Sequence, residues 1–264
     1  MATTRRPSLR EPAADATANA FAGTPSAPFA DFLGEVRCVD PGNRLFEEGV
    51  VRGHLLVLVS GWAYEYRTMS DGRQHVVEIY VPGDVIGLAE VWRRAPGPGV
   101  GTLTEVSAAS VSHADVASCA RHSSHAAAHL LTTLADTAMA VSIKSTSLAR
   151  HTAYERVAFL LWSLRARTHA SDGATAPDTF YCPVSQSVMA DALGLSNVHV
   201  NRSLGHLARD GVLHKKPKQV DVLDNAEWRR IVDLRPVLGP RVGSGRRHPR
   251  SSNDIIAWPV MARG

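Results

Sequence analysis

Five neighbouring residues in the C-terminal half of the chain have side chains of the kinds that recognise DNA bases. Arginine can form paired hydrogen bonds with O6 and N7 of guanine, asparagine can do the same with N6 and N7 of adenine, and valine methyl groups can contact the thymine methyl group. The first of the five, a serine, can also cap the helix that carries the others. The predicted DNA contacts in this stretch are Ser196, Asn197, Val198, Asn201 and Arg202.

The residues around this stretch predict a helix-turn-helix, in which two helices meet at a tight turn. Ala190 is small enough to let the first helix approach the second, and Gly194 can adopt the left-handed conformation that the turn needs. In the second helix, apolar residues at i, i+4 and i+7 face the core and leave the base-reading residues on the opposite face, at the end that enters a major groove. These apolar residues are Val200, Leu204 and Leu207. An ordinary helical hairpin with a solvated polar face is the alternative.

A basic hairpin is predicted directly after the second helix. Gly211 ends that helix, and residues 212–223 predict two short strands around a basic turn, which together make a winged helix-turn-helix. Residues 202–218 hold five basic residues against the single acid Asp210, so positive charge gathers on this segment. Lysines in the turn are expected to contact phosphates, and a merely soluble hairpin tip is the alternative. The predicted phosphate contacts are Lys215, Lys216 and Lys218.

The N-terminal half has the pattern of a strand-rich domain. Residues 55–59 form an apolar run, and Trp62, Tyr64 and Tyr66 follow it in strict alternation. An Asp-Gly turn then leads into a second β-rich run, so the pair predicts a hairpin. A further strand is predicted from Leu103 to Val111. Many short strands at this spacing are typical of a small antiparallel barrel or jelly roll.

A long helix is predicted between the two halves. After Ala120 the apolar residues alternate spacings of three and four, which is the seam along which two copies of a helix pack. A homodimer is therefore expected. Thr152 and Glu155 have the spacing of a capping box, which predicts that a new helix starts there and that the chain breaks near 150–152. The seam consists of Leu131, Leu134, Ala138, Val141, Ser145 and Leu148.

The hairpin, the Pro82–Gly87 segment, the long helix and the winged helix-turn-helix, in that order, resemble the Crp/Fnr superfamily of bacterial transcription regulators. The resemblance covers about residues 30 to 235. It implies an α+β fold: an N-terminal antiparallel β-roll (jelly roll), a long dimerisation helix and a C-terminal winged helix-turn-helix. It also implies a homodimer that senses a small-molecule effector in the roll, binds a near-palindromic site in double-stranded DNA and contacts RNA polymerase.

The chain departs from the best-known branches of that superfamily in its effector region. Cyclic-nucleotide binders have Gly-Glu and then Arg-Ser/Thr-Ala, where this chain has Gly87-Leu88 and residues 96–100 read Pro-Gly-Pro-Gly-Val. Nearby arginines can replace the phosphate contact, although ordinary surface arginines are the alternative. Three widely spaced cysteines do not supply an iron–sulfur cluster, so no cofactor is expected and the effector stays open. The candidate effector contacts are Gly87, Leu88, Arg93 and Arg94.

Composition and charge place the remaining limits. The 264 residues are 44% hydrophobic and 20% charged, as in a globular protein, and no apolar run approaches the roughly 18 residues of a membrane span. We expect a cytoplasmic protein, because Glu11 and Asp15 interrupt the apolar stretch that an export signal needs. The predicted parts are a flexible tail at 1–28, an effector-type β-roll at 29–120, a dimerisation helix at 121–150, a winged helix-turn-helix domain at 151–238 and a basic flexible tail at 239–264.

Enzyme and metal chemistry have weaker support. No nucleophile elbow, P-loop or dinucleotide fingerprint occurs, so neither a catalytic residue nor a metal ligand is predicted. His122, His125 and His129 are spaced as one stripe on a helix, for which a solvated face is the favoured interpretation over a metal or pH site. We therefore expect a sequence-specific DNA-binding transcription regulator. The alternative is a cupin-type small-molecule or metal-binding β-roll protein or enzyme with a helical appendage.

Overall fold

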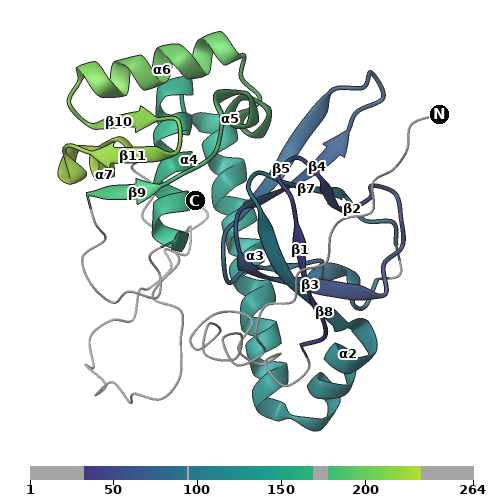
Figure 1. Ribbon diagram of the computed structural model, residues 1–264. Coiled ribbons are helices and arrows are strands. Elements are labelled where there is room, and N and C mark those ends of the chain that lie inside the picture. The colour runs from purple at the N-terminus through teal and green to yellow at the C-terminus, as the bar shows by residue number, and fades with distance from the viewer. Residues whose placement is uncertain (1–32, 94, 169–177, 233–264) are drawn as a thin grey trace, which may run out of the picture.

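The computed structural model describes residues 33–93, 95–168 and 178–232. Arg94 and both predicted tails lie outside these residues. The described chain forms a strand-rich half and a helix-rich half, and the long helix α3 (Ser124–Arg150) runs between them (Figure 1).

The strand-rich half is a jelly roll, as predicted. Its strands pair antiparallel into two four-stranded sheets, ordered β1-β8-β3-β6 and β2-β7-β4-β5. The strands are β1 (Val36–Val39), β2 (Arg44–Phe46), β3 (His54–Ser60), β4 (Ala63–Thr68), β5 (Gln74–Tyr80), β6 (Val85–Ile86), β7 (Gly99–Thr102) and β8 (Val106–Ser112).

Strand β3 explains the continuous apolar run in the sequence. Leu56 and Leu58 belong to the core between the two sheets, whereas Leu55 and Val57 point the other way, into a cluster shared with the helices. A strand that is covered on both faces needs apolar residues at every position, so alternation is lost.

The strand predicted from Leu103 to Val111 is wrong at its N-terminal end. The chain turns at residues 103–105, where the Leu103 amide donates to the carbonyl of Trp62 at 2.8 Å, and β7 precedes the turn while β8 follows it. The prediction missed β7 because glycine is unfavourable in strands. Here a Cβ on Gly99 would lie 2.3 Å from the Tyr66 ring, so glycine provides the space that this ring occupies.

Two helices, rather than one, follow the roll. Helix α2 (His113–His122) begins eight residues before the predicted start of the long helix at 121, and Ser123 separates it from α3 with an extended backbone. The Ser123 hydroxyl accepts from the amide of Ala126 and so caps α3. The prediction that three histidines form one stripe on a single helix is therefore wrong, because His122 ends α2 while the other two histidines belong to α3. Among the described residues, no group of histidine, cysteine, aspartate and glutamate is suited to hold a metal ion.

The predicted break near 150–152 is confirmed. The Thr152 amide donates to Oε2 of Glu155 at 2.7 Å, and the Glu155 amide donates back to the Thr152 hydroxyl at 3.4 Å, which is the reciprocal geometry of a capping box. This box starts α4 (Ala153–Thr168), the central helix of the second half.

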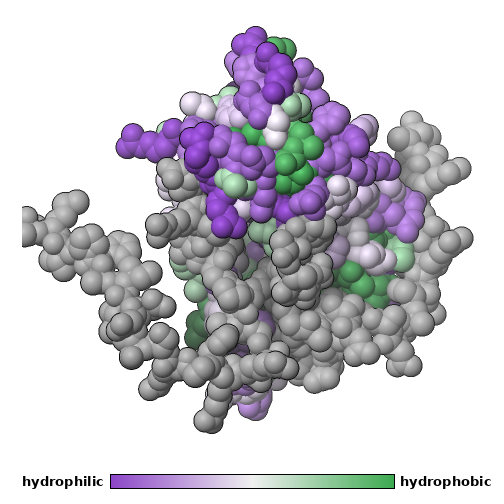
Figure 2. Space-filling model, turned by 90° about the vertical axis from the view of Figure 1, so that its left-hand side faces the viewer, coloured by the Kyte–Doolittle hydropathy of each residue, from purple (hydrophilic) through white to green (hydrophobic). Residues whose placement is uncertain are grey.

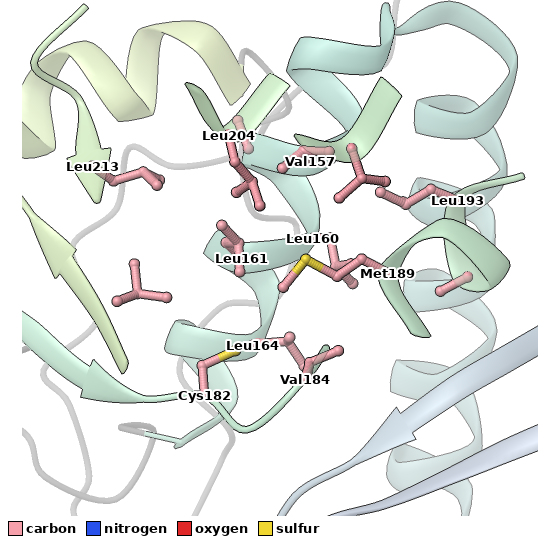
Figure 3. Close-up of a cluster of buried hydrophobic side chains, with 14 of the residues drawn as sticks. Val157, Leu160, Leu161, Leu164, Cys182, Val184, Met189, Leu193, Leu204 and Leu213 are labelled. Atoms are coloured by element: carbon pink, nitrogen blue, oxygen red, sulfur yellow. The ribbon is translucent and has the colours of Figure 1, made fainter. Parts of the chain in front are cut away.

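The helix-rich half packs around α4. Figure 3 shows side chains of α4 such as Leu161 facing Met189, Leu204 and Leu213 from the elements around it. These elements are β9 (Thr179–Tyr181), α5 (Gln186–Leu193), α6 (Asn197–Arg209), β10 (Leu213–Lys216), β11 (Gln219–Val222) and α7 (Asn225–Val232), with the three strands forming one sheet in the order β10-β11-β9.

Helix α7 was not predicted, although it completes this core. Asp224 caps it by accepting from the amides of Ala226 and Glu227, each at 2.9 Å. Its Trp228 is fully buried and donates from Nε1 to the carbonyl of Ala158 at 3.0 Å, so the last helix is tied to the central one. The spacing of Trp228, Ile231 and Val232 was the feature from which this helix was predictable.

The roll and the helix-rich half share one hydrophobic core. Val76 and Ile79 of β5, together with Trp62 just before β4, belong to the same buried cluster as the residues of α4 and α5. Helix α5 lies against β5, where Nδ1 of His75 is 2.9 Å from the carbonyl oxygen of Asp191 (Figure 1). Contacts of this extent fix the position of the helix-turn-helix relative to the roll.

A half-buried arginine joins the two halves at the end of α4. Nη1 of Arg167 donates to Oε1 of Glu78 on β5 at 2.8 Å, and Nη2 donates to Asp84 in the turn before β6. Asp84 also accepts from the Val81 amide at 2.7 Å, and Nζ of Lys144 lies 4.0 Å from Glu78. We call these four charged side chains the interdomain ion cluster.

Candidate nucleic-acid interface

The predicted helix-turn-helix forms with the expected turn at Gly194 and cap at Ser196, and with a further cap at Ser185 that was not predicted. Gly194 has a φ of 62°, in the left-handed region, and ends α5, after which the Leu195 amide donates to the carbonyl of Ala190 at 3.0 Å. Ser185 caps α5 and Ser196 caps α6, each by accepting from the amide three residues on at 3.3 Å. The turn therefore fixes the direction in which α6 leaves.

Helix α6 has two distinct faces. Val200 and Leu207 are fully buried and Leu204 is nearly so, whereas the four residues predicted to read bases are exposed. Val198 has 65% of its surface accessible, which has no folding advantage and suits contact with a partner. The helix lies at the top of the molecule, a part covered mainly by hydrophilic residues (Figures 1 and 2).

The base-reading candidates gather around one hollow at the N-terminal end of α6. Its lining residues are Gln186, Asn197, Val198, Asn201 and Arg202. Four of these five were predicted from the sequence. The fifth predicted residue, Ser196, is occupied with capping, and its hydroxyl also lies 2.9 Å from Nδ1 of His199. The positive end of the α6 dipole points to the same place, which favours an approaching phosphate.

Gln186 is a member of this site that sequence reasoning missed. It is the first residue of α5, and its Oε1 accepts from Nδ2 of Asn201 at 3.2 Å. This bond holds the Asn201 amide in place on the exposed face of α6. The side chain was overlooked because α5 was treated only as a scaffold, although the first turn of that helix also faces the DNA side of such motifs.

The three lysines of the wing have different surroundings. Lys218 lies exposed at the turn between β10 and β11, and Lys216 is exposed but pairs with Oδ2 of Asp221 at 2.7 Å. Lys215 is half-buried, its Nζ donates to the carbonyls of Lys216 and Pro217, and burial lowers its pKa. Lys215 therefore holds the turn of the wing together, while Lys216 and Lys218 face the solvent.

The described candidate effector residues in the roll differ in their surroundings. Gly87 has a φ of 87° and precedes the short 3₁₀ helix η2 (Leu88–Glu90). Leu88 is buried in the apolar cluster between the first sheet and the helices, and Arg93 is exposed. Arg94 lies outside the described residues. Leu88 therefore serves the core of the roll.

An internal ion pair that was not predicted occupies the middle of this region. The buried Arg52 donates from Nη1 to Oε1 of Glu90 at 3.1 Å and from Nη2 to the carbonyl of Pro98, and its guanidinium lies 4.0 Å from the ring centre of Phe46. A Cβ on Gly97 would lie within 2.8 Å of both charged groups, so glycine lets the chain wrap around the pair. Burial lowers the pKa of Arg52 and raises that of Glu90.

Comparison with known proteins agrees with both halves of this description. Residues 36–123 match the cyclic nucleotide-binding domain, and residues 155–231 match the Crp-like helix-turn-helix domain. The chain is 28% identical over 185 residues to the transcriptional activator protein FnrL of Cereibacter sphaeroides, covering 69% of this chain and 74% of FnrL. It is 26% identical over 215 residues to the CRP-like cAMP-activated global transcriptional regulator of Mycobacterium tuberculosis, covering 80% of this chain and 94% of that one.

Among solved structures, FixK2 from Bradyrhizobium japonicum has a TM-score of 0.66 at 21% identity, covering 75% of this chain and 96% of FixK2, which shows the shared fold. A jelly roll joined by a long helix to a winged helix-turn-helix defines a DNA-binding transcription regulator. The chain belongs to the Crp/Fnr superfamily of such regulators. Proteins of this family regulate transcription, in contrast to the cupin-type enzyme that was the alternative.

Proposed function

We propose that the protein is a homodimeric, sequence-specific regulator that binds a near-palindromic DNA site. The observation that carries this proposal is the gathering of Asn197, Val198, Asn201 and Arg202 on the exposed end of α6. Their hydrogen-bonding groups and methyl groups can distinguish base pairs in a major groove. Lys216 and Lys218 of the wing are placed to contact phosphates and to set the register of the helix.

The long helix supports the homodimer. Of the predicted seam residues, Leu131 and Val141 are 67% and 55% exposed, and Ala138 and Ser145 are exposed as well. The other two, Leu134 and Leu148, are half-buried against the hydrophobic clusters of the same chain. Among the described helices, α3 is the one that is long and apolar enough, by length and composition alone, to cross a membrane. A bilayer needs an apolar surface all round, whereas Lys144 of α3 donates to the Val77 carbonyl of the roll. The exposed members of the seam fit a second copy of the helix.

The effector, the other partners and the location remain parts of the same proposal. We propose that the roll at 29–120 responds to a small molecule other than a cyclic nucleotide, since the internal pair of Arg52 and Glu90 lies in the region where the ribose and phosphate contacts are expected. The response passes through the dimerisation helix to the winged domain at 151–238. The protein has no catalytic activity, works in the cytoplasm and contacts RNA polymerase.

Selection of bound duplexes from a random DNA library tests the proposal. Purified protein should enrich an inverted repeat whose half-sites lie about one helical turn apart at near-physiological salt, where nonspecific binding is weak. If the protein enriches single, unpaired sites, the homodimer is wrong. If it enriches nothing with or without a cell extract that supplies small molecules, sequence-specific binding is wrong.

Two alanine substitutions separate base reading from phosphate contact. Arg202→Ala should cost about 1–3 kcal/mol of binding free energy and relax the preference at one base position of each half-site. Lys218→Ala should weaken binding to all sequences alike and reduce the slope of log affinity against log salt by about 1 per copy. Fluorescence titrations against a panel of single-base variants at several salt concentrations measure both effects, and equal sequence-independent losses from the two variants would contradict this division.

A further inference from the structure

An apolar groove lies where the roll meets the start of the long helix. Its lining residues are Trp92, Ala120, Ala127, Leu130, Leu131 and Leu134. All six are apolar, and they come from three segments: the loop after η2, helix α2 and helix α3. Trp92 is 51% exposed and Leu131 is 67% exposed, so two of the lining side chains are large, apolar and open to water. Such a patch on a soluble protein marks an interaction surface.

The groove is continuous with the proposed dimer seam. Leu131 and Leu134 are the first two seam residues, and Ala127 lies four residues before Leu131, which extends the alternation of three and four by one position. Half of the lining therefore belongs to the stripe that a second α3 covers. Trp92 comes from the roll, so the groove joins the roll to the seam.

We propose that the groove receives the Leu131 side chain of a second copy, so that Trp92 of the roll is part of the dimer interface. This inference rests on the proposed homodimer and adds to it a contact between the roll of one copy and the helix of the other. In paired helices a seam residue inserts into a hole formed by the facing residues. The small Ala127 leaves depth for a leucine, and Trp92 covers its side.

Self-complementarity favours this occupant. A two-fold interface requires that one surface carry both the projecting group and the hole that receives it. Each copy has both the exposed Leu131 and the groove, so Leu131 of each copy can enter the groove of the other in one symmetric interface. The contact also gives the segment that follows η2 a direct connection to the partner, so any rearrangement between Gly87 and Pro98 reaches the dimer interface without passing through α3 first.

Cross-linking between two differently tagged copies tests the contact. In a background in which the three native cysteines are replaced, one copy carries Trp92→Cys, the other carries Leu131→Cys, and a short bis-maleimide links thiols that lie close together. We expect a linked heterodimer. A matched pair with Met69→Cys, an equally exposed apolar residue at 53% in the β4–β5 turn, should not link to Leu131→Cys. A linked product for the Met69 pair alone, or for neither pair, overturns the contact.

Sedimentation equilibrium of the full chain gives an independent measure. Trp92→Ala should raise the dimer dissociation constant roughly tenfold or more, as expected for a buried tryptophan at an interface, and Met69→Ala should change it less than about twofold. If Trp92→Ala leaves the dimer dissociation constant unchanged while Leu131→Asp is monomeric, the Trp92 contact is wrong but the homodimer stands. A monomeric wild-type chain overturns both. Flotation of the wild type, but not of Trp92→Ala, with lipid vesicles would assign the groove to a membrane and overturn the proposal.

Discussion

Replacing Arg167 with methionine is expected to lower the free energy of unfolding by about 3–5 kcal/mol and to loosen the winged domain from the roll. The guanidinium contacts Glu78 and Asp84, both on the roll, and its side chain is 21% exposed. Removing it leaves two carboxylates in a poorly solvated place, with only the more distant Lys144 near Glu78. Such an uncompensated pair, rather than the lost attraction alone, makes the effect large.

Hydrogen exchange and urea unfolding measure this effect. Exchange should accelerate at β5 and α5, which face each other across the boundary, and the single unfolding transition should separate into two. Arg73→Met is the matched control, because Arg73 pairs with Asp71 on an exposed turn with 81% of its side chain accessible, and such pairs contribute about 1 kcal/mol or less. Equal behaviour of the two variants would show that the cluster does not hold the halves together.

The same cluster predicts a dependence on pH. Burial by itself would raise the pKa of Glu78, but the charges of Arg167 and Lys144 hold it below its ordinary value of 4.5. A carboxyl group whose pKa is lower in the folded state stabilises the fold, and this contribution is complete at pH values above the ordinary pKa of the group. The contribution is lost as the pH falls through the pKa of the folded state. The wild type should therefore lose interdomain protection below about pH 4.5, and Arg167→Met should show a flatter profile over the same interval.

Gly61→Ala is expected to prevent or strongly impair folding of the roll. Gly61 has a φ of 83°, and an added Cβ would lie 2.0 Å from the carbonyl oxygen of Glu105, which is backbone and cannot move aside independently. The left-handed conformation costs roughly 1–2 kcal/mol for alanine, and the clash adds roughly 1–3 kcal/mol or more. We expect a total loss of about 3 kcal/mol or more, measured by thermal unfolding.

Gly72 provides a close control for that prediction. It also has a φ of 83°, in the β4–β5 turn, but nothing lies within 4 Å of an added Cβ. Gly72→Ala should therefore lower the free energy of unfolding only by the cost of the left-handed conformation, roughly 1–2 kcal/mol. If the two variants lose the same stability, the close approach of residue 105 to Gly61 is not a determinant of the roll.

The helix-turn-helix was predictable from the sequence in detail. Its turn glycine at 194, the caps at 185 and 196 and the buried spacing from Val200 to Leu207 all follow from interactions within a few residues. The capping box at Thr152 is of the same kind. Short-range preferences of this sort are written in neighbouring residue types, so the exposed face of α6 and its candidate DNA contacts could be read before any fold was known.

Only the tertiary structure decided which distant residues meet. Arg167 contacts carboxylates 83 and 89 positions away, and Arg52 reaches Glu90 across 38 positions. Strand β7 exists because its glycines fit against Tyr64 and Tyr66, a fact about the neighbouring strand rather than about glycine. Likewise, Gln186 joins Asn201 and Lys215 turns inward only once α5, α6 and the wing are assembled. Sequence patterns determine the elements and their polar and apolar faces, whereas contacts between elements depend on packing that no local preference encodes.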